Sequence, residues 1–239
     1  MAIICIETST VVCSVATAEK NIITFEHSSC DGPSHAALLG VFVEEALKDI
    51  AARGLTVEAV AVSAGPGSYT GLRIGVSTAK GLCFGLNVPL LAIPTLEILS
   101  NKVITNVDSG EGKSDAKPLY CPMLDARRME VYSAIYDDTL YNVRETRAEI
   151  ITEDSFASYL KDREMVFFGN GSEKCKAVIT SPNARFIDNI HPCAVDMAPL
   201  AVKALAENRT VDVAYFEPFY LKDFIATVPK NKITTFKKS

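Results

Sequence analysis

The chain alternates short apolar runs with amphipathic segments, and this rhythm predicts a mixed α/β fold. Residues 2–7 form an apolar run without a polar break, which is typical of a central strand covered on both faces. The runs predicted as strands in the first part of the chain are 2–7, 10–19, 21–29, 57–65 and 88–93. The segments predicted as helices are 35–53, with Ser34 as N-cap and Gly54 as its stop, 71–86 and 95–104.

The same order returns after a polar stretch at 106–117, which is a candidate linker or mobile loop. The elements predicted after it are three strands within 118–151, a helix at 152–162 capped by Thr152 or Asp154, a strand at 164–171 and a helix at 197–209.

An internal repeat accounts for this second series of elements. Residues 5–17 align without gaps to residues 123–135, and an acid, Glu7 or Asp125, ends the first strand of each copy. Two such β-β-β-α-β-α units, packed face to face, predict a pair of ribonuclease H-like lobes with a cleft between them. The expected divisions are an N-terminal lobe at 1–105, a C-terminal lobe at 106–239 that begins with the linker at 106–117, and a flexible basic tail at 223–239.

Composition narrows the class of protein. With 48% apolar and 22% charged residues, the chain can bury a sizeable core, and its net charge of −5 argues against binding of nucleic acid by bulk electrostatics. The exception is the C-terminal tail, where Lys230, Lys232, Lys237 and Lys238 lie without an acid and are interpreted as solvated.

Targeting signals and cysteine usage point to a compartment. No apolar run approaches the roughly 20 residues that cross a bilayer, and the N-terminal run has no basic segment before it. The seven cysteines are widely spaced and include no CxxC pair, so we expect free thiols in a cytoplasmic protein without a membrane segment.

The glycine-rich stretch at 63–81, SAGPGSYTGLRIGVSTAKG, is the first candidate for chemistry. It enters a helix as a phosphate-binding loop does, but its spacing fits neither the Walker loop nor the dinucleotide fingerprint. Two interpretations therefore stay open: an anion site at a helix N-terminus, or a tight turn between strand and helix.

The two matched acids are the second candidate, because carboxylates at strand ends facing a cleft can hold magnesium and its waters. The alternative is an ordinary pair of solvated surface acids. The candidate anion or nucleotide-binding residues from both features are Glu7, Ser9, Gly65, Gly67, Ser68, Tyr69, Thr70, Gly71 and Asp125.

The sequence gives little support for metal-dependent or nucleophilic catalysis. The three histidines, His27, His35 and His191, include no pair spaced to bind a metal from one helix, and we interpret His35 and His191 as polar surface residues. No GxSxG elbow is present, and no thiol can be paired with an activating base. We therefore assign no catalytic residue and no metal ligand.

The first two helices carry more apolar surface than one sheet face needs, and small residues recur four apart in 71–86. This surplus predicts an interface with a partner, although the second lobe is an alternative cover. The candidate interface residues are His35, Leu38, Leu39, Phe42, Ala46, Arg73, Gly75, Ala79 and Leu82.

These motifs together resemble the bacterial TsaB family over nearly the whole chain. The residues that carry the resemblance are IICIETSTVVCSVAT, SHAALLGVF, AVSAGPGSYTGLRIGVSTAKGL with VPLLAIPTLEIL, MLDARRMEVYSAIY and FFGNG, of which GPGSYTGLRIG is the most specific. The resemblance implies a two-lobed fold of the actin and acetate-kinase type. Two departures are Glu7, where the family often has Asp, and PFYLKD, where Lys222 replaces an arginine.

The resemblance also implies a function. TsaB is an accessory subunit in the synthesis of threonylcarbamoyladenosine in tRNA. It pairs with the catalytic subunit TsaD through the helices of its first lobe, and the ATPase TsaE joins them. We therefore expect a scaffold that activates TsaD, contacts tRNA indirectly, can form a homodimer through the same helices, and meets ATP and magnesium only within the complex. The alternative is an independent small-molecule kinase or ATPase that uses Glu7, the loop at 65–71 and Asp125.

Overall fold

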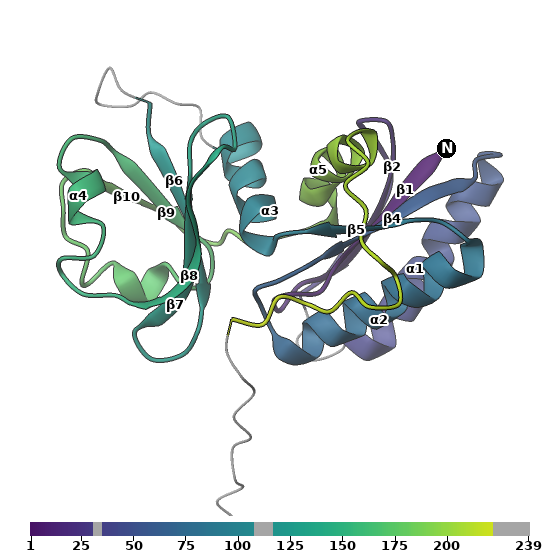
Figure 1. The fold of residues 1–239 in the computed structure, drawn as a ribbon, viewed down its shortest axis with the longest axis horizontal. Helices are drawn as coiled ribbons and strands as arrows, with labels where there is room; N and C mark the ends of the chain where they lie inside the picture. Colours follow the sequence, from purple (N-terminus) through teal and green to yellow (C-terminus); the bar gives the residue numbers. More distant parts are fainter. Residues whose placement is uncertain (31–34, 108–116, 222–239) are drawn as a thin grey trace, which may run out of the picture.

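The computed structural model describes residues 1–30, 35–107 and 117–221, and it contains two five-stranded mixed sheets side by side (Figure 1). The strands of the first sheet are β1 (Ala2–Glu7), β2 (Cys13–Glu19), β3 (Ile22–Ser29), β4 (Val57–Ser63) and β5 (Leu90–Ile93). Their order is β3-β2-β1-β4-β5, with β1 antiparallel to β2 and parallel to β4.

The second sheet repeats this topology. Its strands are β6 (Leu119–Asp125), β7 (Glu130–Tyr136), β8 (Asn142–Ile150), β9 (Met165–Phe168) and β10 (Ala184–Ile187). Their order is β10-β9-β6-β7-β8, which is the order of the first sheet when each strand is numbered within its own half. The predicted duplication and the pair of ribonuclease H-like lobes are therefore confirmed.

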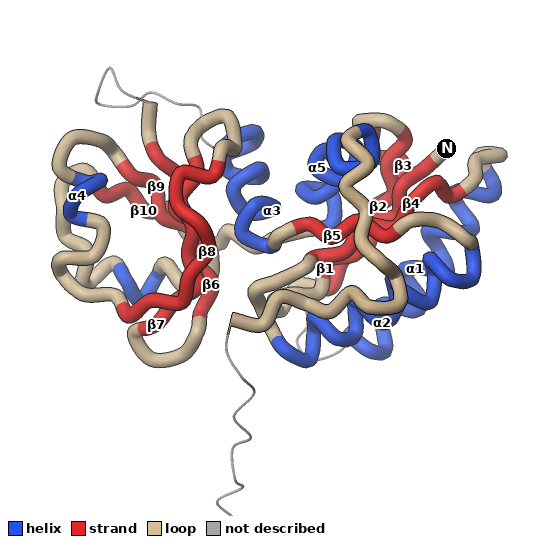
Figure 2. Tube along the Cα trace, in the orientation of Figure 1, coloured by secondary structure: helices blue, strands red, loops and turns tan. Residues whose placement is uncertain are grey.

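Helices cover both faces of the first sheet, as Figures 1 and 2 show. Alternate residues of β1 point to opposite faces, so Ile4 and Ile6 pack toward α1 (His35–Ala52) and α2 (Tyr69–Leu86), while Ile3 and Cys5 pack toward α5 (Ala194–Ala206). This two-sided cover explains why the sequence of β1 has no polar break.

Helices α3 (Thr95–Lys102) and α5 each pack on the sheet formed by the other half of the chain. Helix α3 lies between the two sheets and packs on the second one, where Leu96 and Leu99 contact the cluster around Phe168. Helix α5 returns from the second half to the first sheet. Lys102 Nζ joins the two helices through an ion pair with Asp196 at 2.9 Å. The boundary at 105/106 separates the two sheets, and its status as a division between independent lobes stays a prediction.

A C-terminal strap, residues 210–221, runs back over the first lobe along α2. Val211 forms a β-bridge with Leu90, and Lys80 Nζ donates to the carbonyl oxygens of Ala214 and Phe216. The strap therefore brings the end of the described chain to a point between the two lobes, as Figure 1 shows in yellow.

Several predicted elements differ in extent. Helix α4 spans only Ala157–Leu160 instead of 152–162, because Phe156 at its N-cap has a left-handed φ of 64° that breaks the helical path. Helix α5 begins three residues earlier than predicted, and β10 was not predicted at all. The left-handed Gly54 after α1 is confirmed as its stop, whereas the predicted cap Ser34 lies outside the described residues.

The gapless alignment of the two copies is wrong by one residue in their second strands. Glu7 pairs with Ser14 in the first hairpin, whereas Asp125 pairs with Val131 in the second. The alignment had placed Tyr132 opposite Asp125. The second turn is one residue shorter because Arg127 and Arg128 both adopt left-handed backbone conformations.

Candidate functional site

The glycine-rich loop between β4 and α2 lies directly on the turn that follows β1. Ser68 N–H donates to the carbonyl oxygen of Ser9 at 2.6 Å, and the Thr8 hydroxyl donates to the carbonyl oxygen of Gly71 at 2.8 Å. Ser68 also caps α2, since its hydroxyl accepts the N–H of Gly71. These bonds tie the start of α2 to the end of β1.

The glycines of this segment are required by that contact. A Cβ atom at Gly67 would lie 2.5 Å from the Ser9 carbonyl oxygen, and one at Gly71 would lie closer still to the Thr8 carbonyl oxygen. One turn further along α2, a Cβ at Gly75 would collide with the Thr8 hydroxyl. Close packing of α2 on the turn therefore accounts for these glycines without a bound phosphate.

The C-terminal strap covers another part of the loop. Phe219 N–H donates to the Ala64 carbonyl oxygen at 2.7 Å, and the Phe219 carbonyl oxygen lies 2.8 Å from where a Cβ of Gly65 would be. Gly65 has a φ of 99°, a conformation that strongly favours glycine. Its identity is thus explained by the backbone and by the strap.

Glu7 is completely buried at the end of β1. Its Oε1 accepts the N–H of Ser9 at 2.6 Å, and its Oε2 has no hydrogen-bond partner among the residues that the structure describes. Burial raises the pKa of Glu7 to about 7, although the nearby Ser9 and Ser63 oppose the shift. Neither serine hydroxyl makes a hydrogen bond of normal geometry, so this carboxyl is poorly solvated.

Asp125, at the matching position of the second lobe, has a different environment. Its side chain is 47% exposed and forms an ion pair with Lys174. It also accepts the N–H of Arg127, while its own N–H donates to Asn170 Oδ1. One predicted acid is therefore solvated and neutralised by a lysine, and the other is sealed in the core.

Glu7 and the loop glycines do not fit direct contact with a nucleotide phosphate or its magnesium, because Glu7 has no exposed oxygen and protein backbone fills the space beside the glycines. Ser9 is buried with them. The exposed start of α2, with Ser68 and Thr70, is where an anion site stays a prediction.

A cluster that was not predicted lies at this end of α2. The Arg73 guanidinium carbon lies 4.1 Å from the centre of the Tyr69 ring, whose own centre is 5.1 Å from that of Tyr220 on the strap. Arg73 Nε also donates to the Tyr220 hydroxyl at 3.4 Å. Tyr220 is 147 residues away along the chain from Arg73, and no periodicity or spacing in the sequence indicates the contact.

The residues predicted for a partner interface differ in how deeply they are buried, and most of them lie in the core. Arg73 is exposed, and Leu38 and Leu82 are partly buried. The other six are buried in the core of this chain: His35, Leu39, Phe42, Ala46, Gly75 and Ala79. Phe42, for example, is only 5% exposed and stacks on His27.

His35 was expected on the surface, and this interpretation is wrong. The side chain is buried, and its Nε2 lies 2.9 Å from the carbonyl oxygen of Thr10. The imidazole thus holds the start of α1 against the turn after β1. In the parts of the chain that the structure describes, no group of three or more His, Cys, Asp or Glu side chains is placed to bind a metal, and no helix there is long and apolar enough to span a membrane.

Gly71→Ala is expected to lower the free energy of unfolding by roughly 2 kcal/mol or more, because its Cβ would collide with the Thr8 backbone, which cannot rotate away. Gly81→Ala on the same helix is the matched control. No atom lies within 4 Å of the added Cβ there, so higher helix propensity should raise stability by up to about 1 kcal/mol. Urea unfolding measures both, and equal effects would contradict the packing role of Gly71.

Glu7→Gln is expected to change how stability depends on pH. Because the native carboxyl has a raised pKa, it binds its proton more tightly than in the unfolded chain, so wild-type stability should fall as pH rises from 4.5 to about 7. The shift corresponds to roughly 3 kcal/mol at most. Glutamine keeps an acceptor for Ser9 N–H and cannot ionise, so the variant should lose this slope and be more stable than wild type at pH 8.

Urea unfolding at a series of pH values tests this expectation, with Glu58→Gln at an exposed position of β4 as the control. An unchanged slope in Glu7→Gln would show that Glu7 does not cause the pH dependence.

Comparisons with known proteins agree with this geometry. The TsaD family, described as tRNA N6-adenosine threonylcarbamoyltransferase, matches residues 31–230. The chain is 28% identical over 232 residues to the tRNA threonylcarbamoyladenosine biosynthesis protein TsaB of Escherichia coli (strain K12), which covers 95% of this chain and 96% of that protein. It is 29% identical over 187 residues to the protein of the same name from Bacillus subtilis (strain 168), covering 75% of each.

Among solved structures, the chain is similar to two from Pseudomonas aeruginosa. One is described as an uncharacterized protein with similarity to peptidase YEAZ, with a TM-score of 0.78, 25% identity and coverage of 92% of this chain and 99% of that one. The other, YeaZ, gives a TM-score of 0.73 at the same identity and coverage. The family match spans most of the chain, so the chain belongs to the TsaD family, and its relatives within that family are the TsaB proteins.

Proposed function

We propose that this chain is a non-catalytic subunit for synthesis of threonylcarbamoyladenosine in tRNA, which pairs with TsaD and activates it. The observation that carries the proposal is the similarity to TsaB of Escherichia coli over 95% of the chain. The buried Glu7 supports a non-catalytic role, because an acid without an exposed oxygen cannot act on a substrate. The alternative, an independent kinase or ATPase, requires Glu7 together with the loop at 65–71 and Asp125.

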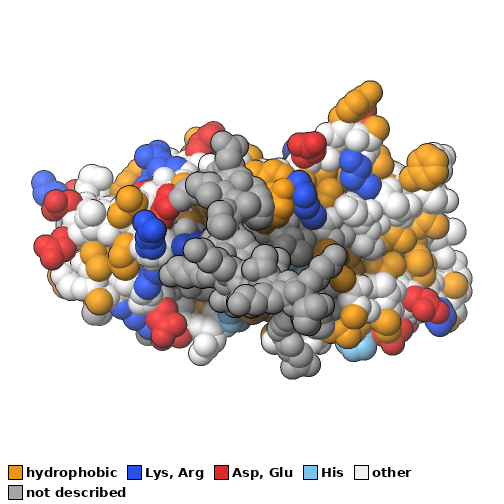
Figure 3. Space-filling model, turned by 90° about the horizontal axis from the view of Figure 1, so that it is seen from below, with side chains coloured by type: hydrophobic (Ala, Val, Ile, Leu, Met, Phe, Trp, Pro, Cys, Tyr) orange, Lys and Arg blue, Asp and Glu red, His pale blue; other side chains and the backbone are white. Residues whose placement is uncertain are grey.

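The outer faces of α1 and α2 form the proposed docking surface for TsaD. Phe84 is 85% exposed and Val41 is 48% exposed, which are large values for apolar side chains on helices. Gly40 and Gly81 have no atom within 4 Å of an added Cβ, so a partner helix can approach both backbones closely. Figure 3 shows hydrophobic side chains over this part of the first lobe, seen from below.

This surface uses the predicted helices but a different face of each. Six of the residues predicted for the interface are buried in the core of the lobe, whereas Leu38, Arg73 and Leu82 reach its surface. TsaE is proposed to join the pair after it has formed. In the absence of TsaD, the same outer face is proposed to pair with a second copy of the chain.

Phe84→Asp is expected to weaken pairing with TsaD at least tenfold, because it replaces an anchoring ring by a charge that must be desolvated. Ile150→Asp, on β8 of the other lobe, is the matched control, since Ile150 is 69% exposed. Co-purification and titration calorimetry measure the affinity, and thermal unfolding checks that both variants fold. Pairing of Phe84→Asp at wild-type affinity would refute this docking surface.

A further inference from the structure

We propose that this chain contacts single-stranded RNA directly, through a surface made of the Tyr69–Arg73–Tyr220 cluster and the Arg127–Arg128 turn. The inference rests on the proposed function for its choice of nucleic acid. It differs from the expectation of indirect contact with tRNA, and it follows from the side chains that the structure brings together.

The first part of the surface is a stack of flat groups. Arg73 lies over the face of Tyr69 at 4.1 Å, and Tyr220 packs beside Tyr69 with the ring planes at 45°. Arg73 is exposed, its Nε donates to the Tyr220 hydroxyl, and the Glu217 carboxylate on the strap is near enough to interact with its charge. A guanidinium held over aromatic rings and open to solvent is suited to stack on an unpaired nucleobase and to contact its phosphate.

The second part is the turn between β6 and β7. Arg127 and Arg128 have φ values of 71° and 50°, a left-handed backbone that costs a non-glycine residue free energy. Both side chains are exposed, and within the described residues neither guanidinium has a hydrogen bond or an ion pair. Glycine or asparagine would fit the backbone better, so the turn presents two free cations at a cost to its own stability.

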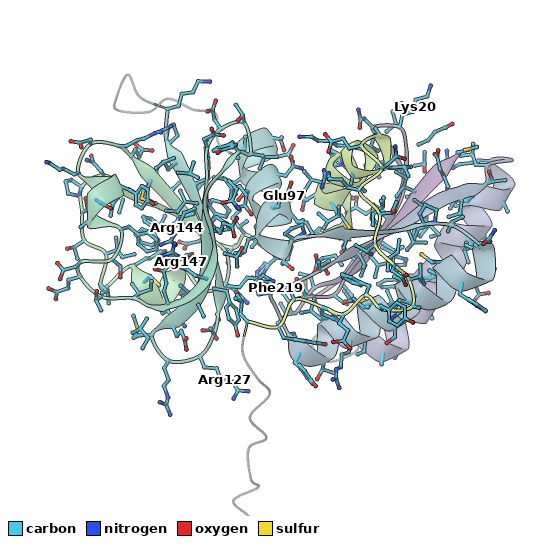
Figure 4. All side chains as sticks on the ribbon, viewed as in Figure 1. Lys20, Glu97, Arg127, Arg144, Arg147 and Phe219 are labelled. Carbon is cyan, nitrogen blue, oxygen red and sulfur yellow. The ribbon has the colours of Figure 1, made fainter. Side chains whose placement is uncertain are left out.

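Both parts lie near the point where the described chain ends, in the view of Figure 4. Phe219 is labelled just above that point, between the two lobes, and Arg127 below it at the lower edge of the second lobe, while Tyr220 follows Phe219 directly. One extended strand can therefore touch both parts.

The sequence that follows the strap is rich in positive charge. Residues 222–239 contain five lysines and one aspartate, although the whole chain carries a net charge of −5. A lysine-rich sequence directly after Leu221 favours a polyanion over a neutral partner. An acidic peptide would satisfy the charges but has no planar base to stack on the exposed Arg73 guanidinium.

The preference for a single strand follows from the geometry of stacking. In an RNA duplex the base faces are already covered by their neighbours, so an aromatic and arginine stack gains little from it. In a loop or single strand the faces are available, and each base stacked on a ring typically changes affinity several-fold to a hundredfold.

The test measures fluorescence anisotropy of a labelled single-stranded RNA of mixed sequence, its duplex, and an unmodified tRNA transcript, each with the full 239-residue chain. We expect the single strand to bind more tightly than the duplex. The double variant Arg73→Ala with Tyr220→Ala should bind it about tenfold more weakly. Arg209→Ala, which removes an exposed arginine already paired with Glu207, is the control and should bind as wild type does.

A second double variant, Arg127→Gly with Arg128→Gly, separates recognition from folding. It should weaken binding of RNA and reduce its dependence on salt, while its melting temperature stays the same or rises because the left-handed turn is relieved. If the two arginines had only a structural role, the double variant would have a lower melting temperature and would bind RNA as wild type does.

Three results would overturn the inference: no binding of the single strand by the chain alone or with TsaD, wild-type affinity in both double variants, or equal competition by a poly-glutamate peptide of matched charge. Failure of TsaD pairing with RNA binding intact would count against the proposed function instead. Absence of RNA binding by the wild-type chain, with TsaD pairing intact, would count only against this surface.

Discussion

The fold of the first lobe depends on one close contact, in which the start of α2 packs backbone to backbone on the turn after β1. Gly67 and Gly71 permit this approach to Ser9 and Thr8, and hydrogen bonds from Ser68 and Thr8 hold it. Because no side chain separates the two segments, the end of β1 is sealed. The burial of Glu7 and its raised pKa follow from this seal.

The second lobe has a related close contact, in which the segment after β9 packs on the backbone of β6 itself and not on the turn that follows it. A Cβ at Gly169, just after β9, would collide with the carbonyl oxygen of Met123, and Gly171 N–H donates to that same oxygen at 3.0 Å. Yet the Asp125 side chain stays 47% exposed and forms an ion pair with Lys174. Close backbone packing thus accompanies a buried Glu7 in the first lobe and a solvent-exposed Asp125 in the second.

The sequence allowed most of the order of strands and helices to be predicted, but not the burial and contacts of individual side chains. Apolar runs predicted every strand except β10, because burial on both faces makes strands such as β1 uniformly apolar, and Gly54 marked the end of α1 through its left-handed backbone. The length of α4 depended on the backbone of Phe156, which no pattern reveals. Burial of Glu7 and the contact of Tyr220 with Arg73 depend on segments brought together from far apart in the chain, and local spacing carries no signal for them.

Packing of the glycine-rich loop on the turn after β1 also limits which surfaces of the first lobe are exposed and can bind a partner. The inner face of α2 is occupied by the turn after β1, and one side of the helix is occupied by the strap through Lys80. What remains is the outer face with Gly81 and Phe84, and the N-terminal end where Arg73 lies. Helix α2 therefore presents two separate exposed regions. Arg73 and Phe84 are 11 positions apart on α2, which is about 17 Å along the helix at about 1.5 Å per residue, so a protein bound around Phe84 can leave Arg73 open to RNA.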